Sequence, residues 1–439
     1  AAPGRAYPGK SPDRVCRMTV TMAYPSNREV LERRRDHILV TLWIFVTFKQ
    51  FRFDELVLYP LALYFAWAFV RDFPRIFPLA ARSAVLFVFP AWWLLSALWG
   101  DQTGLILKSG LQLMLTILIC YCIATRLTAR DLFISLLIVS GYYAVMSFLA
   151  PYTGTGTVAR GVFSSKNTMG SAMVILWLAS LCILIDTGFS KKVKLLAAVA
   201  AALAVWQIHR SDSATAVLLA LGIFGLVFCL GILPRSGIFK SPFFYIAALT
   251  VSGITVLMLG VFFSSLTVDP VNTVLAAFGK DGTLTGRTVL WQYAAAQIEQ
   301  QPLLGVGAGG FWTPYDKLSE ASRIYEEFHK ADYATFSFHN SYYEIAVHQG
   351  LIGLSFCVLI VLWTIGCILL FRNKSEPVST VFFLCVCAVT LAKSMTESEL
   401  LAPFALLTIL SLTGGLMSLR GFPAAPGSGK QASGLHVMG

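Results

Sequence analysis

A histidine stands where a polar stretch of the chain gives way to a long apolar run. The local sequence is Phe338-His339-Asn340-Ser341-Tyr342-Tyr343, and Asn or Ser at such a junction is a natural N-cap for a helix. The positive end of that helix would keep the imidazole of His339 neutral. Because a neutral imidazole can take a proton from a hydroxyl group, His339 is a candidate general base, with Asn340 in support.

Four cations could supply positive charge to the same chemistry. Arg160 and Lys166 frame a short segment that ends in Asn167, Arg210 lies in a tight turn, and Arg287 precedes an apolar-patterned stretch. Guanidinium groups bind phosphate oxygens in pairs, so converging Arg side chains would suit a diphosphate. The plain alternative is that each cation only reaches lipid headgroups. We interpret the four cations as a candidate diphosphate site, with Asn167 as a supporting residue.

Acidic residues are sparse, and no Asp-x-Asp pair is present. Catalysis by a metal with oxygen ligands is therefore not supported, and we predict neither a metal nor a cofactor. Glu397 and Glu399 are possible further members of the site. His348 lies inside an apolar run, where a packing hydrogen bond is the expected role. The Gly-rich stretch 305–310 predicts a turn, for which a hinge is favoured over an anion cradle.

The composition indicates a membrane protein. The chain has 439 residues, of which 56% are hydrophobic and 13% charged, whereas the apolar share of soluble domains is about 45–50%. A bilayer-spanning helix needs about 20 apolar residues. The sequence predicts an all-α polytopic membrane protein with about twelve spans, at residues 37–50, 54–70, 79–98, 104–125, 131–149, 167–186, 193–209, 213–232, 243–264, 341–370, 378–395 and 402–419.

These spans divide the chain into five parts. Most of the 34 Lys and Arg residues fall in segments that an inside N-terminus places on the cytoplasmic face, as the positive-inside rule requires. The net charge of +11 therefore indicates topology rather than nucleic-acid binding. The predicted parts are a largely disordered cytoplasmic tail (1–36), spans one to nine (37–264), a long outer loop (265–340), spans ten to twelve (341–420) and a second disordered tail (421–439).

The outer loop is the longest segment between predicted spans. Loops of such length are usually functional. Within it, residues 285–301 predict an amphipathic helix that ends before Pro302 and carries Arg287 in its first turn. The loop therefore brings a fixed positive charge to the face of the membrane on which His339 lies.

An ordered set of residues resembles the bacterial O-antigen ligase family. The His339-Asn340 pair stands at the family's spacing from Gly350 and Gly353, and the segment from Arg160 to Asn167 is also similar to a family segment. The family commonly has an Arg followed after three residues by Leu near the start of the eighth span, whereas Arg210 is followed at that spacing by Ala214. The residues that carry the resemblance in the outer loop and beyond are Arg287, Trp291, Pro302, Gly305, Gly307, His339, Asn340, Gly350 and Gly353.

The resemblance implies a metal-independent membrane glycosyltransferase of GT-C-like architecture, at the periplasmic face of a Gram-negative inner membrane. Its donor would be O-antigen polysaccharide on undecaprenyl diphosphate. Its acceptor would be a sugar hydroxyl of lipid A-core in lipopolysaccharide biosynthesis. Arg287, with Arg160, Lys166 and Arg210, would stabilise the departing diphosphate. His339 would take the acceptor proton in an inverting displacement.

The sequence is also compatible with two related transferase activities and with an unrelated transport activity. O-antigen polymerase and protein O-oligosaccharyltransferase share much of the pattern. Polymerases, however, often carry a second large outer loop, and the protein-glycosylating enzymes are usually longer. A twelve-span secondary transporter would predict two similar halves rather than one long outer loop. In each case membrane lipids are the expected surroundings, and nucleic acid is not an expected partner.

Overall fold

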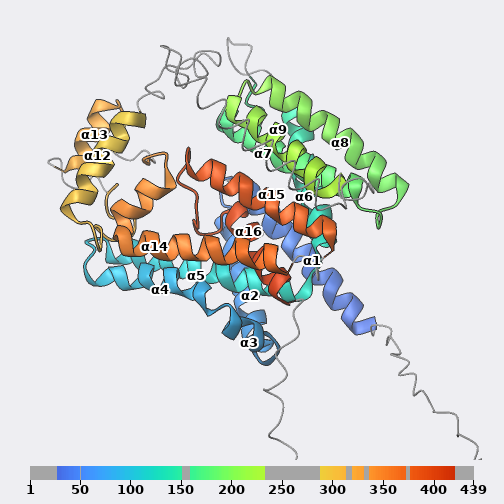
Figure 1. Cartoon of the computed structure of the whole chain (residues 1–439), viewed down its shortest axis with the longest axis horizontal. Helices are drawn as coiled ribbons and strands as arrows, with labels where there is room; N and C mark the ends of the chain where they lie inside the picture. Colours follow the sequence, from blue (N-terminus) through green and yellow to red (C-terminus); the bar gives the residue numbers. More distant parts are fainter. Residues whose placement is uncertain are drawn as a thin grey trace, which may run out of the picture.

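Helices form the described structure. The computed structural model describes residues 27–49, 51–150, 159–232, 287–312, 319–330, 336–371 and 376–420, and within these ranges it contains no strand. Most of the helices pack into one bundle, with α12 and α13 at an edge of it (Figure 1). The elements are α1 (Asn27–Phe48), α2 (Glu55–Arg71), α3 (Phe73–Arg82), η1 (Ala84–Phe87), α4 (Val88–Leu95), η2 (Ser96–Leu98), α5 (Thr103–Arg126), α6 (Ala129–Leu149), α7 (Lys166–Ile185), α8 (Lys191–Arg210), α9 (Ala214–Val227), η3 (Phe228–Ile232), α12 (Arg287–Gln300), α13 (Glu320–Glu327), α14 (Ser341–Leu370), α15 (Pro377–Ser394) and α16 (Leu406–Arg420).

Seven of the described helices are long and apolar enough to cross a membrane, and a bent pair formed by α2 and α3 would raise the number to eight. The seven are α5, α6, α7, α8, α9 with η3, α14 and α15. The regular structure of the described residues is thus all helical, and the chain is a multi-pass membrane protein, as predicted. Three other predicted spans fall on α1, on the segment from Ala84 to Leu98 and on α16, which are shorter or less apolar. The predicted span 243–264 lies outside the described residues.

The predicted span 79–98 is divided rather than continuous. Its first residues belong to α3, which meets α2 at an angle of 91°, and its remainder forms η1, α4 and η2. Pro78 lies inside α3 and Pro90 inside α4. Because Pro lacks an N–H donor and its ring clashes with the preceding turn, such positions favour short or bent helices. At the N-terminus, α1 begins at Asn27, so helix extends into the segment 1–36 that was predicted as a tail.

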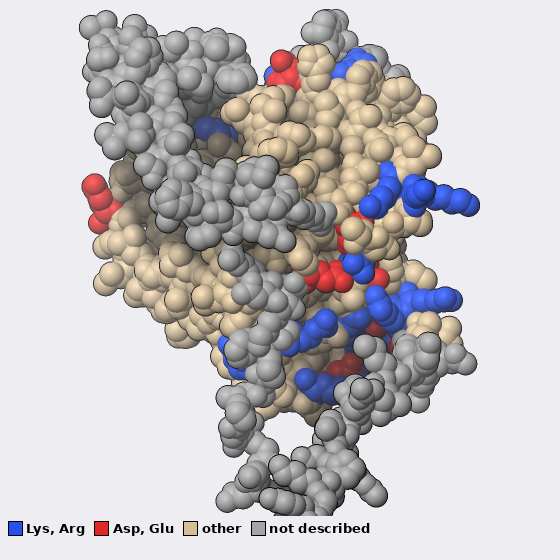
Figure 2. Space-filling view, turned by 45° about the vertical axis from the view of Figure 1, so that its right-hand side comes forward, with Lys and Arg blue, Asp and Glu red and all other residues tan. Residues whose placement is uncertain are grey.

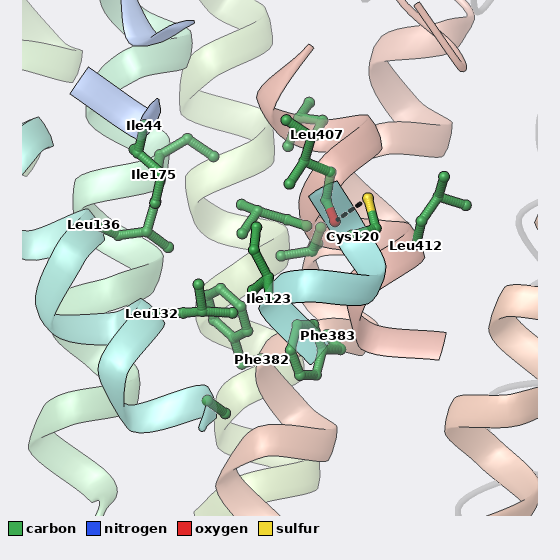
Figure 3. Close-up of a cluster of buried hydrophobic side chains, with 14 of the residues drawn as sticks. Ile44, Cys120, Ile123, Leu132, Leu136, Ile175, Phe382, Phe383, Leu407 and Leu412 are labelled. Atoms are coloured by element: carbon green, nitrogen blue, oxygen red, sulfur yellow. Dashed lines mark hydrogen bonds between the residues drawn. The ribbon is translucent and has the colours of Figure 1, made fainter. Parts of the chain in front are cut away.

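The centre of the bundle is filled by apolar side chains from six helices, α1, α5, α6, α7, α15 and α16. Figure 3 shows Ile44, Ile123, Leu136, Ile175 and Phe382 meeting there, and all five are buried. Since lipid tails are as apolar as these side chains, close packing holds such a core together more than exclusion from water does. The described cysteines are free thiols, and all except the exposed Cys229 are buried.

One end of the bundle carries a network of ion pairs. Arg126 contacts Asp36 at 3.1 Å and Asp72 at 2.6 Å, and Arg130 contacts Asp186 at 2.8 Å. Figure 2 shows Lys and Arg gathered with Asp and Glu towards the lower right of the view, below a broad uncharged surface. The paired residues come from segments that the charge pattern places on the cytoplasmic face. We call this region, where α1, α6, α15 and their neighbours meet, the basic end.

Candidate active site

Helix α12 is attached to the segment that carries His339. Trp291 donates a hydrogen bond from Nε1 to the carbonyl oxygen of Phe338 at 3.0 Å, and its ring stacks on Tyr343 with centroids 5.9 Å apart. Leu290 and Ala294 are buried on the same helix. The predicted helix over 285–301 is thus confirmed as Arg287–Gln300. Its attachment points the first turn towards the start of α14.

Arg287, Glu397 and His339 come together at the start of α14. An Arg287 side-chain nitrogen (Nη2) lies 3.8 Å from Glu397 Oε1, and His339 Nδ1 lies 3.5 Å from Glu397 Oε2. Burial alone would raise the pKa of the Glu397 carboxyl, but the hydrogen bond from His339 and the positive charges of Arg287 and Lys393 outweigh it and hold that pKa below its ordinary value. Glu397 is therefore an anion that joins the two predicted catalytic residues. We call these three residues the His339 group.

The backbone around His339 is fixed on both sides. His339 itself has a φ of +49°, a left-handed conformation that non-glycine residues adopt infrequently. On its C-terminal side, Asn340 caps α14 by accepting hydrogen bonds from the backbone N–H groups of Tyr342 (3.0 Å) and Tyr343 (3.3 Å). The predicted capping role of Asn340 is confirmed. Ser341 Oγ donates to the carbonyl oxygen of Glu397 at 2.6 Å, which holds the loop before α16 against the same helix end.

A second carboxylate, that of Glu344, ties three segments together behind His339. Its oxygens accept hydrogen bonds from Trp312 Nε1 at 2.8 Å, from the backbone N–H of Phe338 at 2.9 Å and from Ser398 Oγ at 3.2 Å. His348 Nε2 lies 3.9 Å from the same carboxylate. Glu344 therefore connects the Gly-rich loop, the His339 segment and the loop before α16, and it fixes the strained backbone on the N-terminal side of His339.

The backbone conformation and close packing explain why glycine occupies positions 350 and 305. At Gly350 the φ and ψ angles are 66° and −178°, a region open in practice only to glycine, and a Cβ atom there would lie 2.0 Å from the carbonyl oxygen of Leu303. The resulting kink in α14 frees Leu351 N–H to donate to Pro302 at 2.8 Å. Gly305 in turn approaches the backbone of α14 so closely that its Cβ would lie 2.6 Å from Gly350 N.

The predicted turn at 305–310 is therefore present, and its contacts differ from those expected of a free hinge. Val306 N–H donates to the carbonyl oxygen of Val347 at 3.0 Å, and Ala308 N–H donates to Ser96 Oγ at 3.2 Å. His348 accepts a hydrogen bond from Gly309 N–H through Nδ1 at 3.3 Å, the kind of packing bond predicted for this histidine. The turn is thus docked between α14 and the start of η2.

The remaining predicted cations form a separate group around the start of α7 and the turn between α8 and α9. Lys166 Nζ lies 3.3 Å from Asp212 Oδ2, and Ala159 N–H donates to the carbonyl oxygen of Arg210 at 3.1 Å, which joins the segment of Arg160 to that turn. Asn167 accepts a hydrogen bond from Ser213 Oγ at 3.0 Å. The guanidinium of Arg210 lies 4.8 Å from the ring centre of Trp206. We call Arg160, Lys166, Arg210 and Asp212 the Lys166 group.

The chain resembles known proteins over most of its length. Residues 197–358 match the family described as O-antigen ligase, a range that includes Arg210, Arg287 and His339. The chain is also 29% identical over 381 residues to the exopolysaccharide production protein ExoQ of Rhizobium meliloti (strain 1021), covering 83% of each chain. Both similarities point to the O-antigen ligase family. These similarities support a membrane glycosyltransferase of the ligase and polymerase type.

A cavity of about 850 Å³ is lined by sequence neighbours of both charged groups. On one side it is lined by Thr168, two residues after Lys166 in the first turn of α7. On another side it is lined by Lys393 and Glu399, which pair at 2.7 Å and flank the loop that holds Glu397. Within the described part of the chain, the four predicted site cations and His339 thus fall into two groups, and sequence neighbours of both groups line one cavity. Their joint action on one diphosphate stays a prediction.

Glu344 and Lys393 were not predicted as site residues from the sequence. An acidic residue inside a predicted span is a default functional candidate, because a charge at membrane depth is costly. Glu344 lies in the first turn of the span that starts at Ser341, so that rule could have found it. Glu397 was named as a possible member, and the structure places it at the centre of the His339 group.

Proposed function

We propose that the protein is an O-antigen ligase that transfers O-antigen polysaccharide from undecaprenyl diphosphate to a sugar hydroxyl of lipid A-core in lipopolysaccharide biosynthesis. The reaction takes place at the periplasmic face of the inner membrane, needs no metal and inverts the anomeric centre. The observation that carries the proposal is the contact of Arg287 and His339 with one carboxylate, that of Glu397, at the start of α14.

The geometry supports a division of roles within the His339 group. A carboxylate on His339 Nδ1 favours the tautomer with the proton on that nitrogen and the lone pair on Nε2. Nε2 then takes the proton of the acceptor hydroxyl while its oxygen attacks the anomeric carbon of the donor. The bond from that carbon to the diphosphate oxygen breaks, and undecaprenyl diphosphate leaves as an anion. Arg287 stabilises the charge that develops on this leaving group.

The cavity of about 850 Å³ supports a place for the donor. Its volume lies in the range of about 300–1,000 Å³ that ligand pockets occupy. Arg52 and Lys393 line it together with the carboxylates of Asp54, Glu55 and Glu399, and the Lys166 group stands at the end of α7 that borders it. We assign the lipid diphosphate to this cavity, with Arg160, Lys166 and Arg210 on the donor and the His339 group at the reacting carbon.

A second candidate function is transfer of the donor glycan to another glycan, as a polymerase does. The similarity to an exopolysaccharide production protein over 83% of the chain favours it specifically. The chemistry at Arg287 and His339 would be the same, and only the acceptor would differ. Transfer to a protein hydroxyl is a third outcome of the same chemistry.

Reconstitution decides among these acceptors. The purified protein in liposomes receives a glycan on undecaprenyl diphosphate, EDTA and one of three acceptors, namely lipid A-core, a second lipid-linked glycan or a Ser-rich peptide. We expect a glycosylated lipid A-core product. A product formed only with the second glycan would establish the polymerase function, and a strict requirement for a divalent metal would overturn the role given to the arginines.

A further inference from the structure

A second pocket lies at the basic end, remote in the bundle from the His339 group. It has a volume of about 560 Å³ and lies between α1, α6, α15 and α16. Three guanidinium groups line it, those of Arg33, Arg130 and Arg420, together with the carboxylates of Asp131 and Glu376. The proposed transfer reaction uses none of these residues.

The three arginines are not equally neutralised. Arg33 pairs with Asp131 at 2.7 Å, and Arg130 pairs with Asp186 at 2.8 Å and with Glu376 at 3.3 Å. Arg420 donates a hydrogen bond to the backbone carbonyl oxygen of Ala124. Among the residues that the structure describes, no carboxylate lies within ion-pair distance of Arg420. The pocket therefore has a positive charge that an anion could neutralise.

The two helices that begin at this pocket differ in how their first turns are capped. At α6, Thr128 and Asp131 form a reciprocal capping box with the first backbone N–H groups. At α15, the N-cap residue Glu376 makes no side-chain cap hydrogen bond. A helix start without a cap is a natural place for an anion, because its N–H groups and the helix dipole both favour negative charge.

A buried hydroxyl at the same place points independently to a ligand. Thr380, in the first turn of α15, lines the pocket and is only 8% exposed. Its Oγ1 has no hydrogen-bond partner among the described residues. Leaving a buried hydroxyl without a partner is costly, so a group that accepts this hydrogen bond would stabilise the site. Phosphate oxygen is such an acceptor.

We propose that this pocket binds the phosphate of a phospholipid headgroup. Arg420 pairs with the phosphate, Thr380 Oγ1 donates a hydrogen bond to it, and the start of α15 supplies backbone donors and the positive helix end. Phe383 and Met417, which also line the pocket, provide an apolar side for the glycerol and the first acyl carbons. The bound lipid links α15 and α16 to α1 and α6 at the end of the bundle opposite the transfer site.

Lipid binding by the full chain tests this proposal without any activity assay. The protein is delipidated in neutral detergent, and its melting temperature and its retained lipids by native mass spectrometry are followed on addition of phosphatidylethanolamine, phosphatidylglycerol or inorganic phosphate. Arg420→Gln keeps a donor for Ala124 but removes the charge. We expect both lipids to raise the melting temperature of the wild type and to bind the variant about tenfold more weakly.

Two further variants make the test specific. Thr380→Val removes the unpartnered hydroxyl with little change of shape, so we expect the lipid-free protein to be as stable as the wild type or more so, and the gain on lipid addition to shrink. Lys192→Gln, an exposed charge on α8 outside the pocket, should respond to lipid as the wild type does. Equal lipid responses in Arg420→Gln and Lys192→Gln, or an equal effect of inorganic phosphate, would overturn the proposal.

Discussion

The His339 group and the Lys166 group contain the same kinds of side chain in different surroundings. In the His339 group, Arg287, Glu397 and His339 are 21%, 32% and 36% exposed, whereas Lys166 and Asp212 are 43% and 73% exposed. Electrostatic interactions are stronger where water is partly excluded. The first group is therefore suited to stabilising charge in a transition state, and the second to attracting an anionic donor.

The two groups also differ in how they are held. Trp291, Asn340, Ser341 and Glu344 fix the backbone around His339 through hydrogen bonds to main-chain atoms. The pair of Lys166 and Asp212 joins two side chains at the surface, where such pairs contribute about 0–1 kcal/mol. Precise positioning is what a reacting group needs, so the difference assigns chemistry to one group and donor capture to the other.

A large effect is expected from Arg287→Lys. Lys keeps the charge but loses the paired N–H donors that match phosphate oxygens. We expect the transfer rate from a lipid-diphosphate donor to fall about 100- to 1,000-fold, the range found when one donor to a developing anion is removed. Activity within twofold of the wild type would remove Arg287 from the leaving-group site. Arg323→Lys, at an exposed arginine of α13 that pairs with Glu320, is the matched control.

A smaller loss is expected from Glu397→Gln, which removes the anion between Arg287 and His339. We expect transfer to fall about 10- to 100-fold, as when a carboxylate that orients a histidine is lost. Glu399→Gln, in the same loop, should be much milder. Equal losses in the two variants would contradict an orienting role for Glu397.

The same carboxylate predicts a pH dependence of stability. Its pKa in the folded protein lies below the ordinary value of 4.5. Its contribution to the free energy of unfolding is therefore complete above about pH 4.5 and is lost as the pH falls through the lowered value. Urea unfolding of the wild type and Glu397→Gln should differ most above that pH and converge in stronger acid. A difference that grows as the pH falls would contradict this sign.

Glu344→Gln tests the support behind His339. An amide has one acceptor oxygen for the three donors that meet the carboxylate, and an unpartnered buried donor costs about 1–3 kcal/mol. We expect a loss of stability of this size and slower transfer at unchanged donor affinity. The exposed Glu299→Gln on α12 is the control. Wild-type stability of Glu344→Gln would show that the three segments are held by other contacts.

The smallest effect is expected from Lys166→Gln. Losing one partly exposed charge should raise the donor KM about two- to fivefold, since surface charges contribute at most about 1 kcal/mol. The rate with saturating donor should stay that of the wild type, because the interaction is the same in the ground state and the transition state. A large fall of kcat would place Lys166 in the reacting centre instead.

Local signals in the sequence were enough for several parts of the site. Asn340 before an apolar run predicted the start of α14, whose bounds are Ser341–Leu370, and the pattern before Pro302 predicted α12. Other features depend on contacts between distant residues. Glu397 and His339 are 58 positions apart, and no local pattern pairs them. The division of the span 79–98 likewise depends on how α3 and α4 pack, although Pro78 and Pro90 are positions that favour short or bent helices.

The assignment of chemistry to the His339 group and of donor capture to the Lys166 group is tested most directly by the turnover of donor that is already bound. His339→Ala and Lys166→Gln are each loaded with a labelled glycan on undecaprenyl diphosphate in EDTA, mixed with acceptor, and followed through a single turnover. The account predicts that Lys166→Gln transfers its bound glycan at the wild-type rate, while His339→Ala binds donor but transfers it about 10²- to 10⁴-fold more slowly. Transfer by His339→Ala at the wild-type rate would contradict it.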